Sequence, residues 1–405
     1  MKIGKFSKEI NLTIDTIRHY MELGLIIPDK KGAHYDFDER CKNDVNDILE
    51  LKEMGFTLKE ITSLFTYKRL GKLTQYQEYE CYKEFFINKK NQIEKEINNL
   101  SNSLMKLTKK IEELSTLEYS ENFKIGLDIS MIGLFKCLKC GGRLVLDKGS
   151  IEDNKIINGE LKCDCGETYV IRNGILLANN KFLCTDDKIQ YDHIVGYINE
   201  TSPKYLEKVY SSLEWIHKKV DFNDFKNKVI LDLGSGSGFL LRYIYNELPD
   251  NSVYIAVDHN IERHMFLKRM LEKSKVKKNI IFICADFLEM PLKEKVADIV
   301  IDYTGTSNYS FEHEDFLLKS VDKYIKEKVL IIGSYIIFKN FGANNIINKK
   351  FRKNFMLNNV KKELTKLNYK VIYEIMSDVI DEGGKYEDYF NEDEKVQPYL
   401  FYGKR

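Results

Sequence analysis

The sequence predicts a multidomain chain that combines all-α segments with an α/β domain. Three observations support this: a heptad repeat within residues 75–117, two cysteine pairs within residues 136–177, and alternating strands and helices after residue 225. At 405 residues the chain is longer than one typical domain. The segments we expect are 1–73, 74–117, 118–180 and 181–405.

Composition and charge limit the classes of function. Apolar residues make up 43% of the chain, which is enough for hydrophobic cores, and 63 basic residues nearly cancel 62 acidic ones. Net charge therefore does not predict nucleic-acid binding, and any prediction of such binding must rest on local geometry. No apolar run approaches the roughly 18 residues of a membrane span, and the first residues lack a signal core. We expect a cytoplasmic protein without a membrane partner.

The N-terminal segment shows short helices separated by small turns. Asn11 and Leu12 form a turn, and Thr13 is a candidate N-cap for a helix over residues 14–22. Two short helices about a tight turn make a helix-turn-helix, whose second helix can enter the major groove of DNA. Many helical pairs share this pattern, so on its own it is a weak signal.

The order of motifs over residues 1–117 resembles the MerR family of transcription regulators. The matching runs are Ile3-Gly4-Lys5-Phe6-Ser7, Thr16-Ile17-Arg18-His19-Tyr20, Glu22-Leu23-Gly24-Leu25 and Gly55-Phe56-Thr57-Leu58-Lys59-Glu60-Ile61. The resemblance implies a winged helix-turn-helix that binds an inverted repeat in double-stranded promoter DNA.

The resemblance also implies which residues contact DNA. Arg18 and Tyr20 would contact phosphates, and a wing would carry further contacts. The wing departs from the family pattern, because Ala33-His34-Tyr35 stands where the family usually has Gly-Tyr-Arg; the arginine contact to phosphate is lost. The alternative is that each polar residue is solvated surface. The implied DNA-binding residues are Thr13, Thr16, Arg18, Tyr20, Lys30, Lys31, His34 and Tyr35.

The segment from Gln75 to Leu117 carries a heptad repeat, with apolar residues spaced 7, 4, 3, 4, 3, 4 and 3 apart. A helix with one narrow apolar stripe cannot bury that stripe alone, so it pairs with a copy or docks elsewhere. We expect a homodimer through residues 75–117, and the resemblance implies an antiparallel coiled coil. We interpret Cys81 as a packing residue, because no further cysteine occurs between Glu84 and Lys136. The repeat consists of Phe86, Ile93, Ile97, Leu100, Leu104, Leu107, Ile111 and Leu114.

Two cysteine pairs follow the heptad segment. Cys137 and Cys140 form one pair, and Cys163 and Cys165 form the other, each followed by glycine. Four thiolates fill a tetrahedral structural zinc site and leave no open catalytic position. The second pair has a one-residue gap where two is usual, and the alternative is a pair of reduced turns without metal. The strands predicted around the pairs make the segment resemble a small β zinc ribbon.

An apolar strand that runs into a glycine-rich turn begins the C-terminal domain. Gly234, Gly236 and Gly238 allow positive φ and a close approach of ligand to backbone. About 20 residues on, the next strand ends in Asp258, an acid that can accept from two ribose hydroxyls. Further strands are expected at 280–284, 297–301 and 329–333. This alternation predicts a doubly wound parallel sheet with ligands at the carboxyl ends of its strands.

These motifs, with Ala285-Asp286-Phe287 after the third strand, resemble the class I S-adenosylmethionine-dependent methyltransferases over about residues 225–405. A dinucleotide oxidoreductase would share the glycine turn and the acid, but not Ala-Asp-Phe or a final antiparallel hairpin at 370–376 and 399–402. The resemblance implies a Rossmann-like methyltransferase sheet with an antiparallel last strand. The implied S-adenosylmethionine residues are Asp232, Gly234, Ser235, Gly236, Gly238, Asp258, His259, Asp286 and Phe287.

The segment that begins at Asp302 occupies the position where the family contacts its methyl acceptor. It is not Asn-Pro-Pro-Tyr, which argues against the amino groups of adenine or cytosine, and no Pro-Cys pair stands there, which argues against covalent methylation of cytosine. Asp302, Tyr303 and His313 are candidates for acceptor positioning or proton acceptance. The alternative for His313 is a solvated helix residue.

The sequence thus predicts a homodimeric MerR-type regulator whose C-terminal domain binds S-adenosylmethionine and methylates, or senses, a small molecule. One alternative is primarily a methyltransferase, acting on a small molecule or RNA, with an auxiliary DNA-binding and dimerisation half. Another is a methyltransferase fold that has lost catalysis and only senses its ligand. The acceptor, the promoter and the direction of control are left open.

Overall fold

The computed structural model of the protein describes all residues except 33, 72–74, 116–122, 179–192 and 392–393. The chain forms two compact units, Met1–Glu118 and Tyr119–Arg405. Among the helices of the described residues, none is long and apolar enough to cross a membrane.

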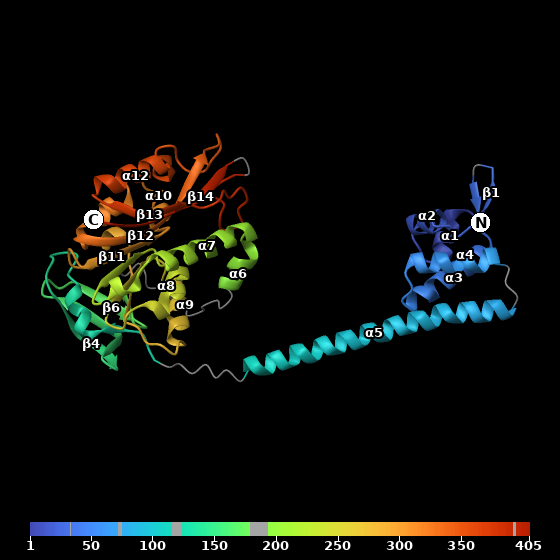
Figure 1. The fold of residues 1–405 in the computed structure, drawn as a ribbon, viewed down its shortest axis with the longest axis horizontal. Coiled ribbons are helices and arrows are strands. Elements are labelled where there is room, and N and C mark those ends of the chain that lie inside the picture. Colours follow the sequence, from blue (N-terminus) through green and yellow to red (C-terminus); the bar gives the residue numbers. More distant parts are fainter. Residues whose placement is uncertain (33, 72–74, 116–122, 179–192, 392–393) are drawn as a thin grey trace. The chain divides into compact units, whose positions relative to one another are not determined.

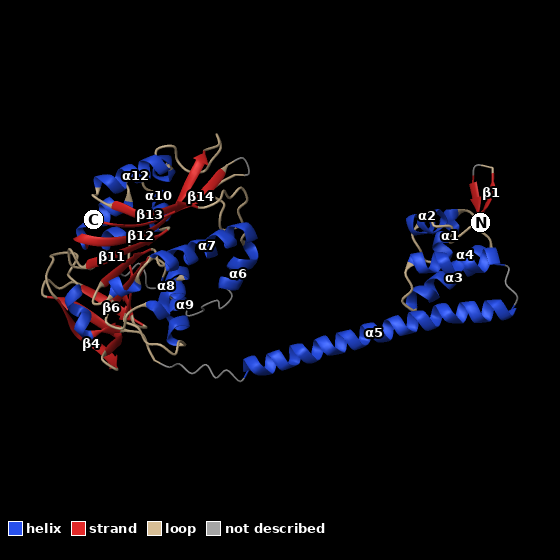
Figure 2. Cartoon of the chain, in the orientation of Figure 1, coloured by secondary structure: helices blue, strands red, loops and turns tan. Residues whose placement is uncertain are grey.

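The first unit contains a helical core with a two-stranded wing (Figures 1 and 2). Thr13 caps the second helix by accepting a hydrogen bond from the backbone N–H of Thr16 at 3.1 Å, as its N-cap position predicts. The rings of Phe6 and Phe37 stack at 4.6 Å, which joins the first helix to the segment after the wing. The elements are α1 (Ile3–Glu9), α2 (Ile14–Glu22), β1 (Asp29–Lys31), β2 (His34–Asp36), α3 (Glu39–Glu53) and α4 (Leu58–Gly71).

The heptad segment is one helix, α5 (Gln75–Ser115), of 41 residues. Its first part packs on its own unit: Phe86 meets the ring of Phe56 at 5.4 Å, and the largely buried Lys89 pairs with Glu60 at 2.9 Å. The repeat from Ile97 to Leu114 is 53–70% exposed. The start of the predicted seam is therefore covered within the first unit, whereas the rest is an apolar stripe that this unit leaves exposed.

The second unit is built on a doubly wound sheet: successive strands are added first on one side of β8 and then on the other. Its seven C-terminal strands run in the order β10-β9-β8-β11-β12-β14-β13. The first five are parallel, and β14 is antiparallel to both neighbours, which confirms the predicted α/β sheet with an antiparallel last strand. The switch point lies between β8 and β11, where such sheets open a crevice for ligands. These strands are β8 (Val229–Leu233), β9 (Val253–Asp258), β10 (Ile280–Cys284), β11 (Ala297–Tyr303), β12 (Ile325–Asn340), β13 (Lys370–Met376) and β14 (Lys395–Lys404).

Helices cover both faces of this sheet. Ile230 packs with α7, α8 and α9 on one face, whereas Leu231 packs with α11 and α12 on the other, because adjacent strand residues point to opposite faces. Both faces are buried, as a parallel sheet requires. The helices are α6 (His193–Glu200), α7 (Pro203–Lys219), α8 (Phe239–Ile244), α9 (Ile261–Glu272), α10 (Gly305–Ser310), α11 (Leu317–Val321) and α12 (Leu357–Lys366).

The cysteine module continues the same sheet. Its last strand pairs in parallel with β10, with Ile175 opposite Phe282 and Leu177 opposite Cys284. The run from Ile175 to Leu177 is entirely buried, so the module shares backbone hydrogen bonds and core with the α/β strands and lies in the same compact unit. Its strands are β3 (Leu127–Asp128), β4 (Leu144–Glu152), β5 (Lys155–Cys163), β6 (Thr168–Arg172) and β7 (Ile175–Leu177).

Candidate functional site

The glycine turn after β8 is held against the end of β9. The backbone N–H groups of Gly234 and Ser235 both donate to the carbonyl of Val257, at 2.9 and 3.0 Å. Gly234, Gly236 and Gly238 all have positive φ, and a Cβ at Gly238 would collide with the side chain of Leu267. The Ser235 hydroxyl is buried without a hydrogen-bond partner. A buried polar atom of this kind needs a partner, which a bound ligand can supply.

Two acids stand at the strand ends beside this turn. The carboxylate of Asp258 accepts from the backbone N–H groups of Gly236 and Asn260, at 2.9 and 2.8 Å. Asp232 accepts from the hydroxyl of Tyr254 at 2.8 Å, and burial raises the pKa of Asp232 to about 7. A cationic ligand group would favour the ionised form of Asp232 over the protonated one.

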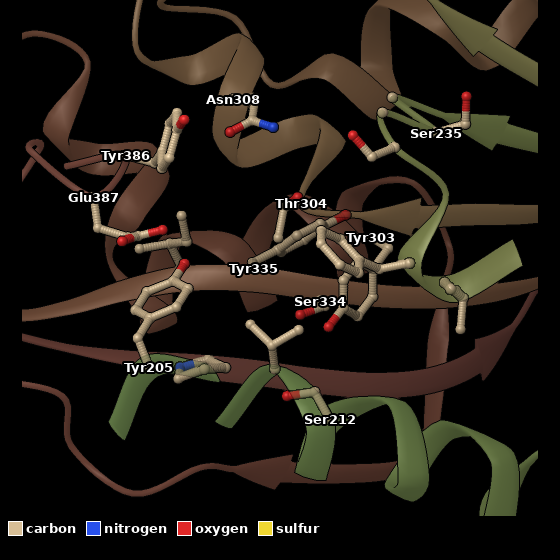
Figure 3. Close-up of a pocket in the computed structure, with 18 of the residues that line it drawn as sticks. Tyr205, Ser212, Ser235, Tyr303, Thr304, Asn308, Ser334, Tyr335, Tyr386 and Glu387 are labelled. Atoms are coloured by element: carbon tan, nitrogen blue, oxygen red, sulfur yellow. The ribbon is translucent and has the colours of Figure 1, made fainter. Parts of the chain in front are cut away.

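A cavity of about 310 Å³ opens at this point (Figure 3). Of the predicted residues, Asp232, Gly234, Ser235, Gly236, Asp258 and Tyr303 line it. Residues from distant parts of the chain complete the wall, including Tyr205, Val209 and Ser212 on one face of α7. The others include Tyr197, Thr304, Asn308, Ser334, Tyr335, Ile336, Tyr386, Glu387 and Tyr389.

Asp302 is fully buried behind this wall. Its carboxylate accepts from the backbone N–H and hydroxyl of Thr306, at 2.7 and 2.6 Å, and from the hydroxyl of Tyr335 at 2.7 Å. These bonds hold the turn after β11, where Thr304 has a positive φ of 67°. Asp302 therefore positions the cavity wall, and its oxygens are occupied by protein donors.

Of the remaining predicted residues, Tyr303 lies in the cavity wall, whereas His313 and Asp286 lie outside it. Tyr303 lines the cavity, and burial raises the pKa of its hydroxyl, which stays protonated. His313 is exposed, its ring stacked on Tyr309 at 3.9 Å. Asp286 is exposed and caps a short helix by accepting from the N–H of Leu288 at 2.8 Å.

Two further predicted residues lie close to the glycine turn and to Asp258. The ring of Phe287 lies 3.4 Å from where a Cβ of Gly234 would stand. The imidazole of His259 is 72% exposed and lies 3.8 Å from the carboxylate of Asp258.

Sequence reasoning missed the tyrosines and the glutamate of the C-terminal segment. Tyr386, Glu387 and Tyr389 follow no strand end or recognisable motif, and Tyr197 and Tyr205 lie in α6 and α7, which carry no motif that would mark them. The one available signal was the density of tyrosine and acidic residues between residues 385 and 390.

The four cysteines converge as predicted. Their sulfur atoms all lie within 4.8 Å of one another, with Cys137 to Cys165 at 3.6 Å and Cys140 to Cys163 at 3.4 Å. A tetrahedron with Zn–S bonds of about 2.3 Å has sulfurs about 3.8 Å apart, so the spacing fits that metal. A Cβ at Gly142 would lie 3.1 Å from two of the sulfurs, which explains the glycine.

Most of the residues implied for DNA contact are exposed. Thr13, the N-cap of α2, and Arg18 are exposed, whereas Thr16 is half-buried; the guanidinium of Arg18 lies 3.5 Å from Asp15. Tyr20 differs, because its side chain is 2% exposed and packs in the core, which leaves little surface for a phosphate contact. In the wing, Lys30, His34 and Tyr35 are exposed. Lys31 pairs with His34 in the hairpin, and its side chain lies outside the described part.

Comparison with known families divides the chain in the same way. Residues 1–68 match the MerR HTH family of regulatory proteins, and residues 224–394 match a methyltransferase domain family.

Individual relatives match only parts of the chain. An HTH-type transcriptional regulator ZntR homolog of Haemophilus influenzae is 32% identical over 74 residues, which is 18% of this chain and 55% of that protein. A carboxy-S-adenosyl-L-methionine synthase of Helicobacter pylori is 26% identical over 159 residues, which is 39% of this chain and 64% of that protein. The chain thus spans less than two thirds of either relative.

A solved SAM dependent methyltransferase from Aquifex aeolicus is 17% identical, with a TM-score of 0.36 over 53% of this chain and 99% of that one. This likeness is too low to inform function. The two family matches fall on separate segments that the structure places in different compact units. The protein is therefore a fusion of an N-terminal MerR-type helix-turn-helix domain and a C-terminal S-adenosylmethionine-dependent methyltransferase domain.

Proposed function

We propose that the protein is a homodimeric transcription regulator whose C-terminal domain binds S-adenosylmethionine and methylates a small molecule. The observation that carries this proposal is the two-part wall of the cavity. One part is the glycine turn with its two acids, and the other is a tyrosine-rich wall from α7 and the C-terminal segment. A domain that only sensed S-adenosylmethionine would need the first part alone. The two parts enclose a cavity of about 310 Å³, a size that favours a small acceptor over RNA.

The residues beside the glycine turn fit S-adenosylmethionine. Asp232 and the turn would hold the charged methionine end, with Ser235 gaining its missing partner, and Asp258 would accept from the ribose hydroxyls. Phe287, Asp286 and His259 would lie beside the adenosine. When bound, the cofactor supplies a methyl group on a positively charged sulfur.

Sensing without methyl transfer is the second candidate. One observation favours it: among the three residues that the sequence nominated for chemistry, Asp302 is occupied by protein donors, Tyr303 stays protonated and His313 is exposed. Methyl transfer nevertheless depends largely on proximity and orientation, and a dedicated base is not essential.

The first prediction concerns the cofactor. Replacing Asp258 with Ala removes the ribose acceptor, so S-adenosylmethionine should bind about tenfold to 100-fold more weakly, as expected for hydrogen bonds to a charged group. Titration calorimetry measures the affinity. Asp250→Asn is the control, because that side chain is 85% exposed, does not line the cavity and can still accept from the largely buried Lys278. No binding by the unmodified protein at near-millimolar S-adenosylmethionine would refute the proposal.

The cysteine module is proposed as a structural zinc site held by Cys137, Cys140, Cys163 and Cys165. Four protein thiolates leave the metal no open position, so its role is to stabilise the fold. Strand β7 of the module pairs with β10 of the α/β sheet, so the metal would stabilise one edge of the unit that holds the cavity.

Elemental analysis tests the metal. Protein prepared without chelator should contain about one zinc per chain, and Cys163→Ser should lose most of it, because three thiolates bind a structural zinc weakly. Cys41→Ala is the matched control, since Cys41 is a buried cysteine of the other unit. Metal-free unmodified protein would rule the site out.

For the N-terminal helix-turn-helix domain we propose that α2 and the wing contact an inverted repeat in double-stranded DNA. Arg18→Ala should weaken binding across sequences and reduce the salt dependence of log K by about one unit, because one phosphate contact is lost. Footprinting on the DNA upstream of its own gene, over a salt series, measures both. Lys218→Ala, in the other unit and paired with Glu214 at 2.9 Å, is the control. If the unmodified protein protects no repeat, the regulator proposal fails.

The exposed stripe of α5 is proposed as the dimer interface. Leu100 and Leu107 are 70% and 62% exposed, which is costly unless a second helix covers them. Replacing both with Asp should convert a dimer to a monomer in analytical ultracentrifugation. The control is Ser101→Asp with Thr108→Asp, which places the same charges one residue off the stripe. A monomeric unmodified chain at micromolar concentration would contradict this interface.

A further inference from the structure

A buried carboxylate stands in the tyrosine-rich part of the cavity. Glu387 is 4% exposed and lines the cavity. Its carboxylate accepts from the hydroxyl of Tyr197 at 3.2 Å and from the backbone N–H of Gly384 at 3.1 Å. In Figure 3 the carboxylate points into the cavity between Tyr205 and Tyr386. Its oxygens therefore keep capacity for a further donor from the cavity side.

No basic side chain of the described residues pairs with Glu387. The nearby Lys385 pairs with Glu200 at 3.0 Å, and Lys208 pairs with Asp378 at 3.0 Å. Among the described residues, no basic nitrogen lies within ion-pair distance of Glu387. Burial raises the pKa of this carboxyl group, because a buried carboxylate loses the hydration that stabilises its charge. A cation from the ligand would offset that cost.

Aromatic rings surround the carboxylate. The rings of Tyr197 and Tyr386 lie 5.4 Å apart, and the hydroxyls of Tyr205 and Tyr389 are 3.0 Å apart. All four tyrosines line the cavity. Ring faces attract cations, and the attraction is greater where water is excluded. Carboxylate and rings together favour an organic cation over an anion or a neutral molecule.

The segment that carries Glu387 is fitted closely to α6. A Cβ at Gly384 would collide with the carbonyl of Glu200 and with Thr201, and the N–H of Lys385 donates to that same carbonyl at 3.1 Å. The position of the carboxylate is therefore set by backbone packing.

We propose that this compartment binds the ammonium group of the methyl acceptor, so that the acceptor is an amine. This rests on the proposed function, because S-adenosylmethionine must supply the methyl group. In the transfer, Glu387 accepts the ammonium proton, and the freed lone pair on nitrogen forms a bond to the methyl carbon. The carbon–sulfur bond breaks, and its electron pair returns to sulfur to leave a neutral sulfide.

The test uses the full chain without cofactor and three probes of matched shape: n-butylammonium, n-butanol and n-butyrate. Saturation-transfer NMR and calorimetry should detect binding of n-butylammonium in preference to the other two. Glu387→Gln should weaken that binding about tenfold or more, because a desolvated charge pair is lost. Tyr386→Leu, at a half-exposed ring, should weaken it several-fold. Glu382→Gln is the control, since its side chain is 67% exposed on the same segment.

Equal binding of butanol and butylammonium, or unchanged affinity in both Glu387→Gln and Tyr386→Leu, would overturn the proposal. S-adenosylmethionine affinity is measured on the same samples and should be unchanged in Glu387→Gln. If the unmodified protein does not bind S-adenosylmethionine, the proposed function is refuted instead. The two failures are therefore distinguishable.

Discussion

The hydrogen bonds that tie the glycine turn to the end of β9 set the geometry of the whole cavity. Gly234 and Ser235 donate to the carbonyl of Val257, and Asp258, one residue later, accepts from Gly236. The turn and the acid are therefore held by each other. Because β8 and β9 are adjacent parallel strands, the same bonds bring a backbone cradle and a carboxylate to one edge of the sheet. The other walls are placed around this edge.

The same sheet carries the cysteine module, which changes how the chain can transmit a signal. Pairing of β7 with β10 makes the module part of the unit that contains the cavity, rather than a separate small domain between two others. Within one chain, the covalent route from this unit to the N-terminal helix-turn-helix domain passes through the segment after α5 and then through α5 itself. Occupancy of the cavity can regulate DNA binding only if the ligand favours one of two arrangements of that route or of contacts across a dimer.

Residues with similar chemistry take different roles because of what surrounds them. Asp302 and Glu387 are both buried carboxylates, but three protein donors occupy the oxygens of Asp302, whereas Glu387 lines the cavity and pairs with no basic residue in the part of the chain that is described. Asp302 thus stabilises a strained turn, and Glu387 has free capacity for a ligand. The seam of α5 divides similarly: Phe86 is covered by its own unit, while Leu100 is open.

The sequence by itself determined the features that depend on local spacing. The cap at Thr13, the glycine turn, the acids at strand ends, the antiparallel last strand and the convergence of four cysteines all follow from sequence patterns and from the rules of doubly wound sheets. Only the tertiary structure decided which polar groups are occupied and which face a cavity. It placed Tyr20 in a core, removed His313 and Asp302 from the cavity, and brought Tyr205 and Glu387 together from segments about 180 residues apart. The physical reason is that burial and hydrogen-bond saturation are set by contacts distant in sequence, and no local pattern encodes them.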